Sequence, residues 1–237
     1  MQGVINNDRE GGSFVREPRF LPAMKPLFLL LLTASLATAA EPTPPQGKTA
    51  EATELIVATP FDQDAPKTRK GPINGWQAGI GEWWVADGAL HGNELAENNH
   101  PSSCTYKFEA TDLMITAEFR LGESPQIAFA CRDTVPPNNH LGRTFITPEA
   151  VWVTRMSGIS KTTKNEKLAE KKVKIDPDEW HTITIEITGD HYRAKVDDTV
   201  VEATHERYKD AKGIVALVSK GEGAQFRNVQ LWHAKAK

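Results

Sequence analysis

The segment Trp180–Val201 constrains the fold more than any other part of the sequence, because its apolar residues recur at every second position. Three isoleucines within Thr182–Thr188 alternate with threonines and a glutamate, the period of a β-strand with one buried and one solvated face. Gly189-Asp190 follows, and glycine readily adopts the positive φ angle that a hairpin turn requires. A further alternating run at Tyr192–Val196 and a turn at Asp197-Asp198 complete a predicted antiparallel meander of three strands.

Most of the remaining chain consists of short runs of the same kind, separated by turn residues every 8–12 positions or so. Further strands are expected at Leu55–Phe61, Glu82–Ala86, Ala89–Asn93, Cys104–Phe108, Leu113–Leu121, Gln126–Arg132, Leu141–Ile146, Val151–Arg155, Gly213–Ser219 and Ala224–His233. Asp87-Gly88 lies between two of them and is a strong signal for a two-residue hairpin. About a dozen short strands with almost no helix predict an all-β fold, a jelly-roll β-sandwich of two antiparallel sheets.

The charged segment Ser160–Lys174 is the exception to this pattern. It could form one or two helical turns, but a charged run without apolar partners has nothing to bury. We therefore favour a solvated loop there.

The first forty residues have the organisation of an exported protein. Met24-Lys25 precedes a short leucine-rich run and small residues at Ala37–Ala40, which together are typical of a secretory signal peptide. We expect the true start at Met24, a disordered linker over 41–54, which is rich in proline and polar residues, and the folded domain over 55–237. The expected location is periplasmic or extracellular.

Charge restricts the classes of partner. Removing residues 1–40 takes away four basic and three acidic residues, which leaves 24 Lys/Arg and 28 Asp/Glu and a net charge of −4. A protein that binds nucleic acid usually has a basic surplus, so no nucleic-acid partner is expected. No second apolar run is present, so no integral membrane span is expected in the mature chain.

The two cysteines, Cys104 and Cys131, both fall in expected strands. A disulfide would persist in an oxidising compartment, and two buried free thiols are equally compatible with the sequence. Metal binding through them is not expected, because no further ligands stand at a recognisable spacing.

The order of several short motifs resembles that of the 3-keto-disaccharide hydrolase domain family. These motifs are Trp83–Gly92, Asp112–Leu121, Cys131-Arg132, Glu179–Glu186, Gly189-Asp190, Val196-Asp197, Gly213–Leu217 and Phe226–Leu231. The resemblance runs from about Leu55 to the C-terminus and implies the concanavalin A-like lectin/glucanase jelly roll. It also implies secretion, a sugar-derived ligand and, in some members, cleavage of glycosidic bonds in 3-keto sugars.

The sequence departs from the family pattern in the middle of the domain. Family members usually have a strand of the form Tyr-Glu-x-Gln-ϕ-x-Asp, whereas this chain has His140–Pro148 in the corresponding region. The acidic pair expected there is therefore missing.

Three titratable residues are the candidates for catalysis. Glu118 lies on the strand face opposite Phe119, and Arg132 would lie near it if the Leu113–Leu121 and Gln126–Arg132 strands formed a hairpin. His140 follows a Pro-Pro-Asn-Asn loop, and Asp133 ends a strand. The simpler interpretations are a surface salt bridge for Glu118 and inert loop positions for the other two.

Three further residues are candidates for binding substrate. Arg132 and Arg143 would orient a sugar, and Trp152 would stack on one if Val151 and Val153 face the core. The alternative is that Trp152 is the core residue and the two valines face outward. No cofactor is expected. Calcium is common in related sandwiches, but the aspartates of this chain are too scattered to predict a site.

Three functions remain open on the sequence. The first is an exported carbohydrate-active enzyme that hydrolyses 3-keto glycosides or a related sugar. The second is a non-catalytic, lectin-like module that binds an oligosaccharide or polysaccharide, and the third is a structural or adhesion domain of the cell envelope. Two carboxylates and a histidine in one pocket would favour the first, since glycoside hydrolysis by the usual route requires a carboxyl pair.

Overall fold

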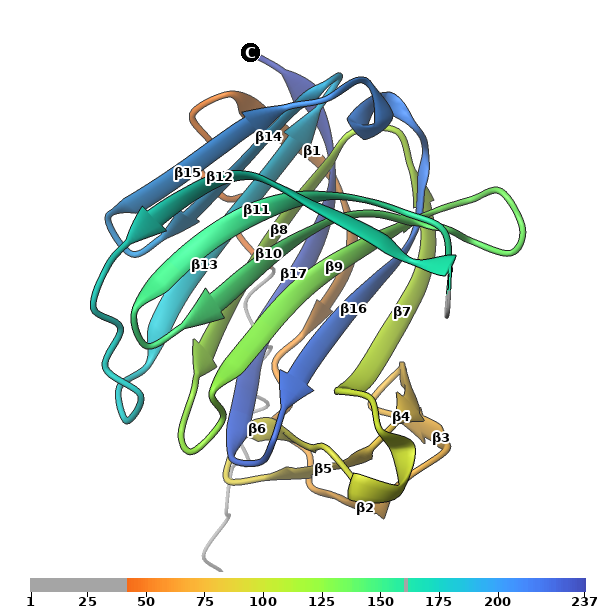
Figure 1. Ribbon diagram of the computed structural model, residues 1–237, viewed down its shortest axis with the longest axis vertical. Helices are drawn as coiled ribbons and strands as arrows, with labels where there is room; N and C mark the ends of the chain where they lie inside the picture. Colours follow the sequence, from red (N-terminus) through yellow and green to blue (C-terminus); the bar gives the residue numbers. More distant parts are fainter. Residues whose placement is uncertain (1–41, 160–161) are drawn as a thin grey trace, which may run out of the picture. The chain divides into compact units, whose positions relative to one another are not determined.

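The computed structural model describes residues 42–159 and 162–237, which form two antiparallel β-sheets packed face to face (Figure 1). These residues contain 17 strands and no α-helix, and two short 3₁₀ helices, η1 (Ala96–Asn98) and η3 (Glu206–Lys209), lie in the connections. The predicted all-β jelly-roll sandwich is confirmed.

The first sheet, sheet A, contains nine strands. Their order is β15 (Thr199–Thr204), β14 (His191–Val196), β13 (His181–Thr188), β8 (Leu113–Arg120), β17 (Ala224–Ala236), β6 (Ala89–Asn93), β5 (Glu82–Ala86) and β2 (Ala65–Thr68), and β1 (Ala50–Thr59) pairs with β17.

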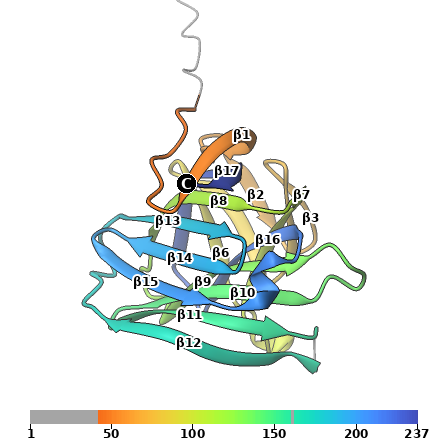
Figure 2. The same cartoon turned by 90° about the horizontal axis from the view of Figure 1, so that it is seen from above.

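The second sheet, sheet B, contains eight strands and forms the other layer seen in Figure 2. Their order is β12 (Lys164–Lys172), β11 (Ala150–Ser157), β10 (His140–Thr147), β9 (Gln126–Asp133), β16 (Lys212–Lys220), β7 (Ser102–Ala110), β4 (Trp76–Ile80) and β3 (Gly71–Ile73).

The predicted meander is present as β13, β14 and β15. Thr188 pairs with His191 around Gly189, which has a φ of 53°, and Asp197 at the next turn has a φ of 47°. The Asp87-Gly88 hairpin is also present, joining β5 to β6 with both residues at positive φ. Each turn therefore forms where the local sequence tolerates a left-handed backbone.

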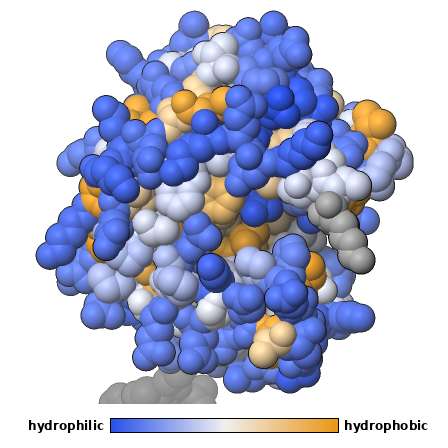
Figure 3. All heavy atoms as spheres, in the orientation of Figure 1, coloured by the Kyte–Doolittle hydropathy of each residue, from blue (hydrophilic) through white to orange (hydrophobic). Residues whose placement is uncertain are grey.

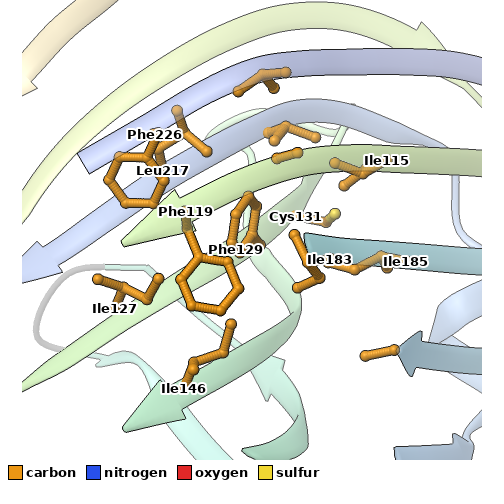
Figure 4. Packing of buried hydrophobic residues seen from close by; sticks show 14 of the residues in the cluster. Ile115, Phe119, Ile127, Phe129, Cys131, Ile146, Ile183, Ile185, Leu217 and Phe226 are labelled. Carbon is orange, nitrogen blue, oxygen red and sulfur yellow. The ribbon is translucent and has the colours of Figure 1, made fainter. Parts of the chain in front are cut away.

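The core lies between the sheets and consists of the inward-facing residues of both. Phe119 and Phe226 of sheet A meet Phe129 of sheet B there, with Ile183 and Ile185 close by (Figure 4). The ring centroids of Phe129 and Phe226 are 5.8 Å apart in an edge-to-face arrangement, a favoured geometry for aromatic pairs.

Both cysteines contribute to this core as free, buried thiols. Cys104 is in β7 and Cys131 is in β9, and β16 lies between these strands. Of the two arrangements compatible with the sequence, the structure has the unbridged one.

The expected linker over 41–54 is wrong at its C-terminal end, because β1 begins at Ala50 rather than Leu55. A buried carboxylate explains this difference. Glu186 of β13 accepts hydrogen bonds from the backbone N–H groups of Thr49 and Ala50, at 2.7 and 2.8 Å. It also forms an ion pair with Arg193 at 2.6 Å. Glu186 lies on the face that alternation predicts to be solvated, yet the N-terminal segment covers it completely.

The expected loop at Ser160–Lys174 is also wrong over most of its length. Residues Lys164–Lys172 form β12, an edge strand that pairs with β11. Its charges are tolerated because an edge strand is largely solvated, and charged side chains are common on edges. Lys167 and Glu170 form an ion pair at 3.1 Å, and Leu168 and Ala169 pack partly against the core.

The expected signal peptide and the start at Met24 lie outside the described residues. Within the described ranges, no helix has the length and apolar character needed to cross a membrane.

Candidate functional site

The outer face of sheet B has a floor of small and apolar side chains. Alternation along the strands points these residues away from the core, and they form a cluster of their own, separate from the main core. The members of this floor are Ala128, Ala130, Phe145, Ala216 and Val218. Figure 3 views this face and shows apolar surface at its centre, between hydrophilic side chains above and below.

A stack of side chains extends from this floor towards the β12 edge. The rings of Phe145 and Trp152 lie parallel, with centroids 5.0 Å apart and planes at 13°. The Lys167 ammonium group lies 4.7 Å from the Trp152 ring centroid, and the Arg143 guanidinium carbon lies 5.2 Å from that of Phe145. Val151 and Val153 are in the core and Trp152 faces outward, which is one of the two arrangements compatible with the sequence.

A basic pocket adjoins the Phe145 end of this stack. Arg132 from β9 and His140 and Arg143 from β10 line it, and register pairing places His140 opposite Arg132. The pocket has a volume of about 650 Å³. Its other lining residues are Ile80, Asn98, Asn99, His100, Met156, Ile159 and Thr163. The connection between β6 of sheet A and β7 of sheet B supplies the asparagines and His100.

Burial and the positive charges of the arginines disfavour the protonated forms of the basic residues in this pocket. Burial, and then the positive charges of Arg143 and Arg132, lower the pKa of His140 to about 3. Burial and the charge of Arg132 likewise lower the pKa of Arg143 to about 10, and burial lowers that of Arg132. His140 is therefore neutral at physiological pH, while both arginines stay charged.

Nitrogen atoms of all three residues lack partners. Among the described residues, Nε of Arg132, Nε of Arg143 and Nδ1 of His140 are buried without a hydrogen-bond partner. Neither arginine forms a salt bridge with any carboxylate of the described chain, and none of the residues that line the pocket is acidic. The pocket thus has donors and positive charge but no anion from the protein to balance them.

A second hollow extends the pocket along the same face. It has a volume of about 490 Å³ and shares Ile80, Asn98 and His100 with the basic pocket. Arg69 and Lys70 line it further along, with Glu97, which pairs with Arg69 at 3.0 Å. The two hollows together form a continuous, mainly basic groove.

Glu118 does not belong to this groove. It lies on sheet A, whereas Arg132 lies on sheet B, because the chain crosses between the sheets after β8 instead of turning back as a hairpin. Its carboxylate accepts hydrogen bonds from Arg227 at 2.6 and 2.8 Å and from Asn228 at 2.6 Å. The structure thus places Glu118 in an ion pair between neighbouring strands.

Asp133 is also outside the groove. It is the residue after Arg132 in an extended strand, so its side chain points the other way. Its carboxylate accepts hydrogen bonds from the backbone N–H of Asn139 at 2.7 Å and from Arg207 at 3.3 Å. The structure therefore brings together Arg132, His140 and Arg143, and it separates the carboxylates of Glu118 and Asp133 from them. Phe145 lies between Arg143 and Trp152.

The described residues contain no cluster of three or more His, Cys, Asp or Glu side chains that could hold a metal ion.

Among the residues of the site that sequence reasoning missed are Phe145, Asn98, Asn99 and His100. Phe145 had a usable signal, because it stands two positions after Arg143 in an extended strand and so shares its face. The other three lie in a connection between the sheets, and no local pattern indicates which face such a connection covers.

A family model for the 3-keto-alpha-glucoside-1,2-lyase-like domain matches residues 70–231, more than half of the chain. None of the curated proteins matches the chain.

Solved structures with the same architecture include both binding modules and enzymes. A carbohydrate-binding module from Bacillus subtilis is 15% identical, with 69% of this chain and 95% of that chain covered and a TM-score of 0.52. The laminarinase from Rhodothermus marinus is 14% identical (76% and 97% covered, TM-score 0.54). A LamA variant from Z. galactanivorans, in complex with laminaritriose and laminaritetraose, is 11% identical (77% and 100% covered, TM-score 0.55). At these identities the likeness concerns the fold.

Proposed function

The chain belongs to the 3-keto-alpha-glucoside-1,2-lyase-like family, which is the 3-keto-disaccharide hydrolase domain family that the order of its motifs resembles. On this premise we propose that it binds a carbohydrate in the groove on sheet B. The observation that carries the proposal is the basic pocket itself. It combines hydrogen-bond donors from Arg132, Arg143 and two asparagines with apolar side chains from Ile80, Met156 and Ile159, the combination that ligand-binding pockets usually have.

Binding without hydrolysis is the form of this function that the geometry supports best. Hydrolysis of a glycoside by the usual route requires two carboxyl groups on either side of the scissile bond. Glu118 and Asp133 lie elsewhere, and the residues that line the pocket contribute no carboxylate. The lectin-like hypothesis is therefore preferred to the hydrolase hypothesis, although the ligand site is centred on Arg143 rather than on Trp152.

A second candidate function is the elimination of an alcohol from a 3-keto glycoside, which the position of a neutral His140 in the pocket favours. The ketone of a 3-keto glucoside acidifies the proton on C2. A neutral His140 could accept that proton while the C2–H electrons form an enolate, which Arg132 and Arg143 would stabilise. The C1–O bond then breaks, and the leaving alcohol takes up a proton. This candidate ranks second because a histidine with a pKa of about 3 is a weak base.

Two experiments on the purified chain separate these candidates. Binding is tested on a glycan array, where we expect the chain to bind at least one carbohydrate. The Arg143→Gln variant should lose this binding, and Arg120→Gln, a matched change on sheet A, should keep it. Elimination is tested by following 3-keto disaccharides with nuclear magnetic resonance, using His140→Gln and the control His233→Gln. Turnover that His140→Gln abolishes and His233→Gln leaves intact would promote the enzyme over the binding module. No glycan binding and no turnover would remove both.

We propose that the chain is exported. An exported chain would meet carbohydrate in the periplasm or outside the cell, in agreement with the signal peptide expected at residues 24–40. Expression with and without this segment, followed by fractionation, tests it: a chain that stays in the cytoplasm with the segment present would contradict export.

A further inference from the structure

Arg132 and Arg143 are charged groups at the base of a pocket that holds no acidic side chain among the residues described. A buried charge without a partner is costly, and proteins usually pair such groups. The same chain does so elsewhere: Arg193, in β14 of sheet A, forms ion pairs with Glu186 at 2.6 Å and Glu202 at 3.0 Å.

Resting on the proposed carbohydrate-binding function, we propose that the ligand is an acidic sugar whose carboxylate or sulfate group is bound between Arg132 and Arg143. The planar guanidinium group presents several N–H donors that match the oxygens of such groups. Among the described residues neither guanidinium group has a hydrogen-bond partner, and only the Nε atoms are fully buried, so the terminal N–H groups remain for an incoming anion.

His140 completes the donor set of this anion site. It lines the same pocket as the two arginines, and its Nδ1 atom is buried, which leaves the other ring nitrogen, Nε2, for a ligand. A neutral imidazole can donate one hydrogen bond to an oxyanion from whichever nitrogen bears the proton.

The remainder of the groove fits a sugar that carries the acidic group. The partly exposed side chains of Ile80 and Ile159 offer an apolar surface for the C–H face of a ring, and Asn98 and Asn99 offer amides for hydroxyl groups. Lys70 lies further along the same groove, where a second acidic residue of an oligosaccharide would reach, while Arg69 there is already paired with Glu97. The net charge of −3 for the whole chain opposes nucleic acid as the anionic ligand.

The test uses matched pairs of glycans on the purified full chain. Each uronate oligosaccharide is compared with the same oligosaccharide after carboxyl reduction, and each sulfated one with its desulfated form, by isothermal titration calorimetry. We expect the acidic member of at least one pair to bind about tenfold or more tightly than its neutral counterpart, since a hydrogen-bonded charge pair contributes that much. Binding should weaken as sodium chloride is raised.

Variants locate the effect. Arg143→Gln and Arg132→Gln should each remove the preference for the acidic member, whereas Arg120→Gln on sheet A should keep it. Thermal unfolding of each variant confirms that the fold is retained, and the loss of a charge without a partner is not expected to unfold the chain.

Three outcomes overturn the inference and are distinguishable. Equal binding of acidic and neutral members, lost in Arg143→Gln, would leave the proposed function standing and remove the anion preference. Sodium sulfate that binds as tightly as the acidic sugars would indicate a site for a simple anion. No binding of either member of any pair would remove the anion site and the proposed function together.

Discussion

Phe145 and Trp152 stack on neighbouring strands of sheet B, with ring centroids 5.0 Å apart and planes only 13° from parallel. Strand order places β10, which holds Phe145, on one side of Trp152 and β12, which holds Lys167, on the other. Both faces of the indole are therefore in contact with protein. Trp152 supports the groove, and the basic pocket beside Phe145 is the part left open to a ligand.

Trp152→Ala should lower the free energy of unfolding by about 2 kcal/mol, since it removes a half-buried aromatic ring from the stack. It should weaken carbohydrate binding less than Arg143→Gln does, because neither face of the ring is free. Urea unfolding and calorimetry measure the two effects. Complete loss of binding with stability unchanged would mean that Trp152 contacts the sugar directly.

Arg143→Met should raise the free energy of unfolding, by about 1–2 kcal/mol, because it replaces a buried charge that lacks a partner with an apolar side chain. The comparison is Arg193→Met, which leaves the carboxylate of Glu186 unpaired and should lower stability by about 3 kcal/mol or more. Opposite signs for these two variants in urea unfolding are the expected result. Destabilisation by both would mean that Arg143 has a structural partner.

Glu118→Gln should leave carbohydrate binding unchanged, since Glu118 lies on sheet A and the groove lies on sheet B. Its ion pair with Arg227 is partly exposed, so the loss of stability should be only about 1 kcal/mol. Calorimetry with the best-bound glycan checks the first expectation, and a fall in affinity of tenfold would contradict the separation of the two sites.

Protonation of His140 should make the fold less stable in acid. Burial and the neighbouring arginines lower its pKa to about 3 in the folded chain from the ordinary value of 6.5, so between these values the unfolded state binds a proton that the folded state does not. Stability is therefore complete above pH 6.5 and falls with pH towards 3, by up to about 1.4 kcal/mol per pH unit.

His140→Gln isolates this contribution, because the other titrating groups are common to both chains. The difference in free energy of unfolding between wild type and variant, measured between pH 7 and pH 4.5, should decline with pH. The histidine resonances offer an independent check, and a His140 midpoint near 6.5 would contradict the prediction.

The two cysteines should be unreactive in the folded chain. Burial raises the pKa of Cys131 to about 12 and also raises that of Cys104, so neither forms the nucleophilic thiolate at neutral pH. Titration with a thiol reagent should detect no reactive thiol in the native chain and both thiols in denaturant. Rapid reaction of either thiol without denaturant would contradict the burial.

The sequence was sufficient to predict the all-β sandwich, because strand period and turn residues are local properties. The isoleucines of β13 and the Asp87-Gly88 turn behave as their pattern predicts. The errors occurred where a distant segment decides the outcome. Glu186 is buried by residues near Thr49, and β12 is a strand only because β11 lies beside it.

The candidate site was predictable only in part. Alternation and the loop position indicated Arg132, His140, Arg143 and Trp152, and the structure brings the first three into one pocket. Glu118 and Asp133 were equally reasonable by residue type, and both are held in ion pairs elsewhere.

The sequence alone determined which residues alternate, where the chain turns and therefore that two layers of strands would form. Only the tertiary structure decided which sheet each strand joins: the few residues after β8 carry the chain across to the other layer, although a hairpin of the same length was equally compatible with the pattern. The physical reason is that alternation assigns a side chain to one of two faces, whereas contact between strands depends on core packing across the whole chain. That packing separates Glu118 from Arg132 and places two arginines side by side without a carboxylate.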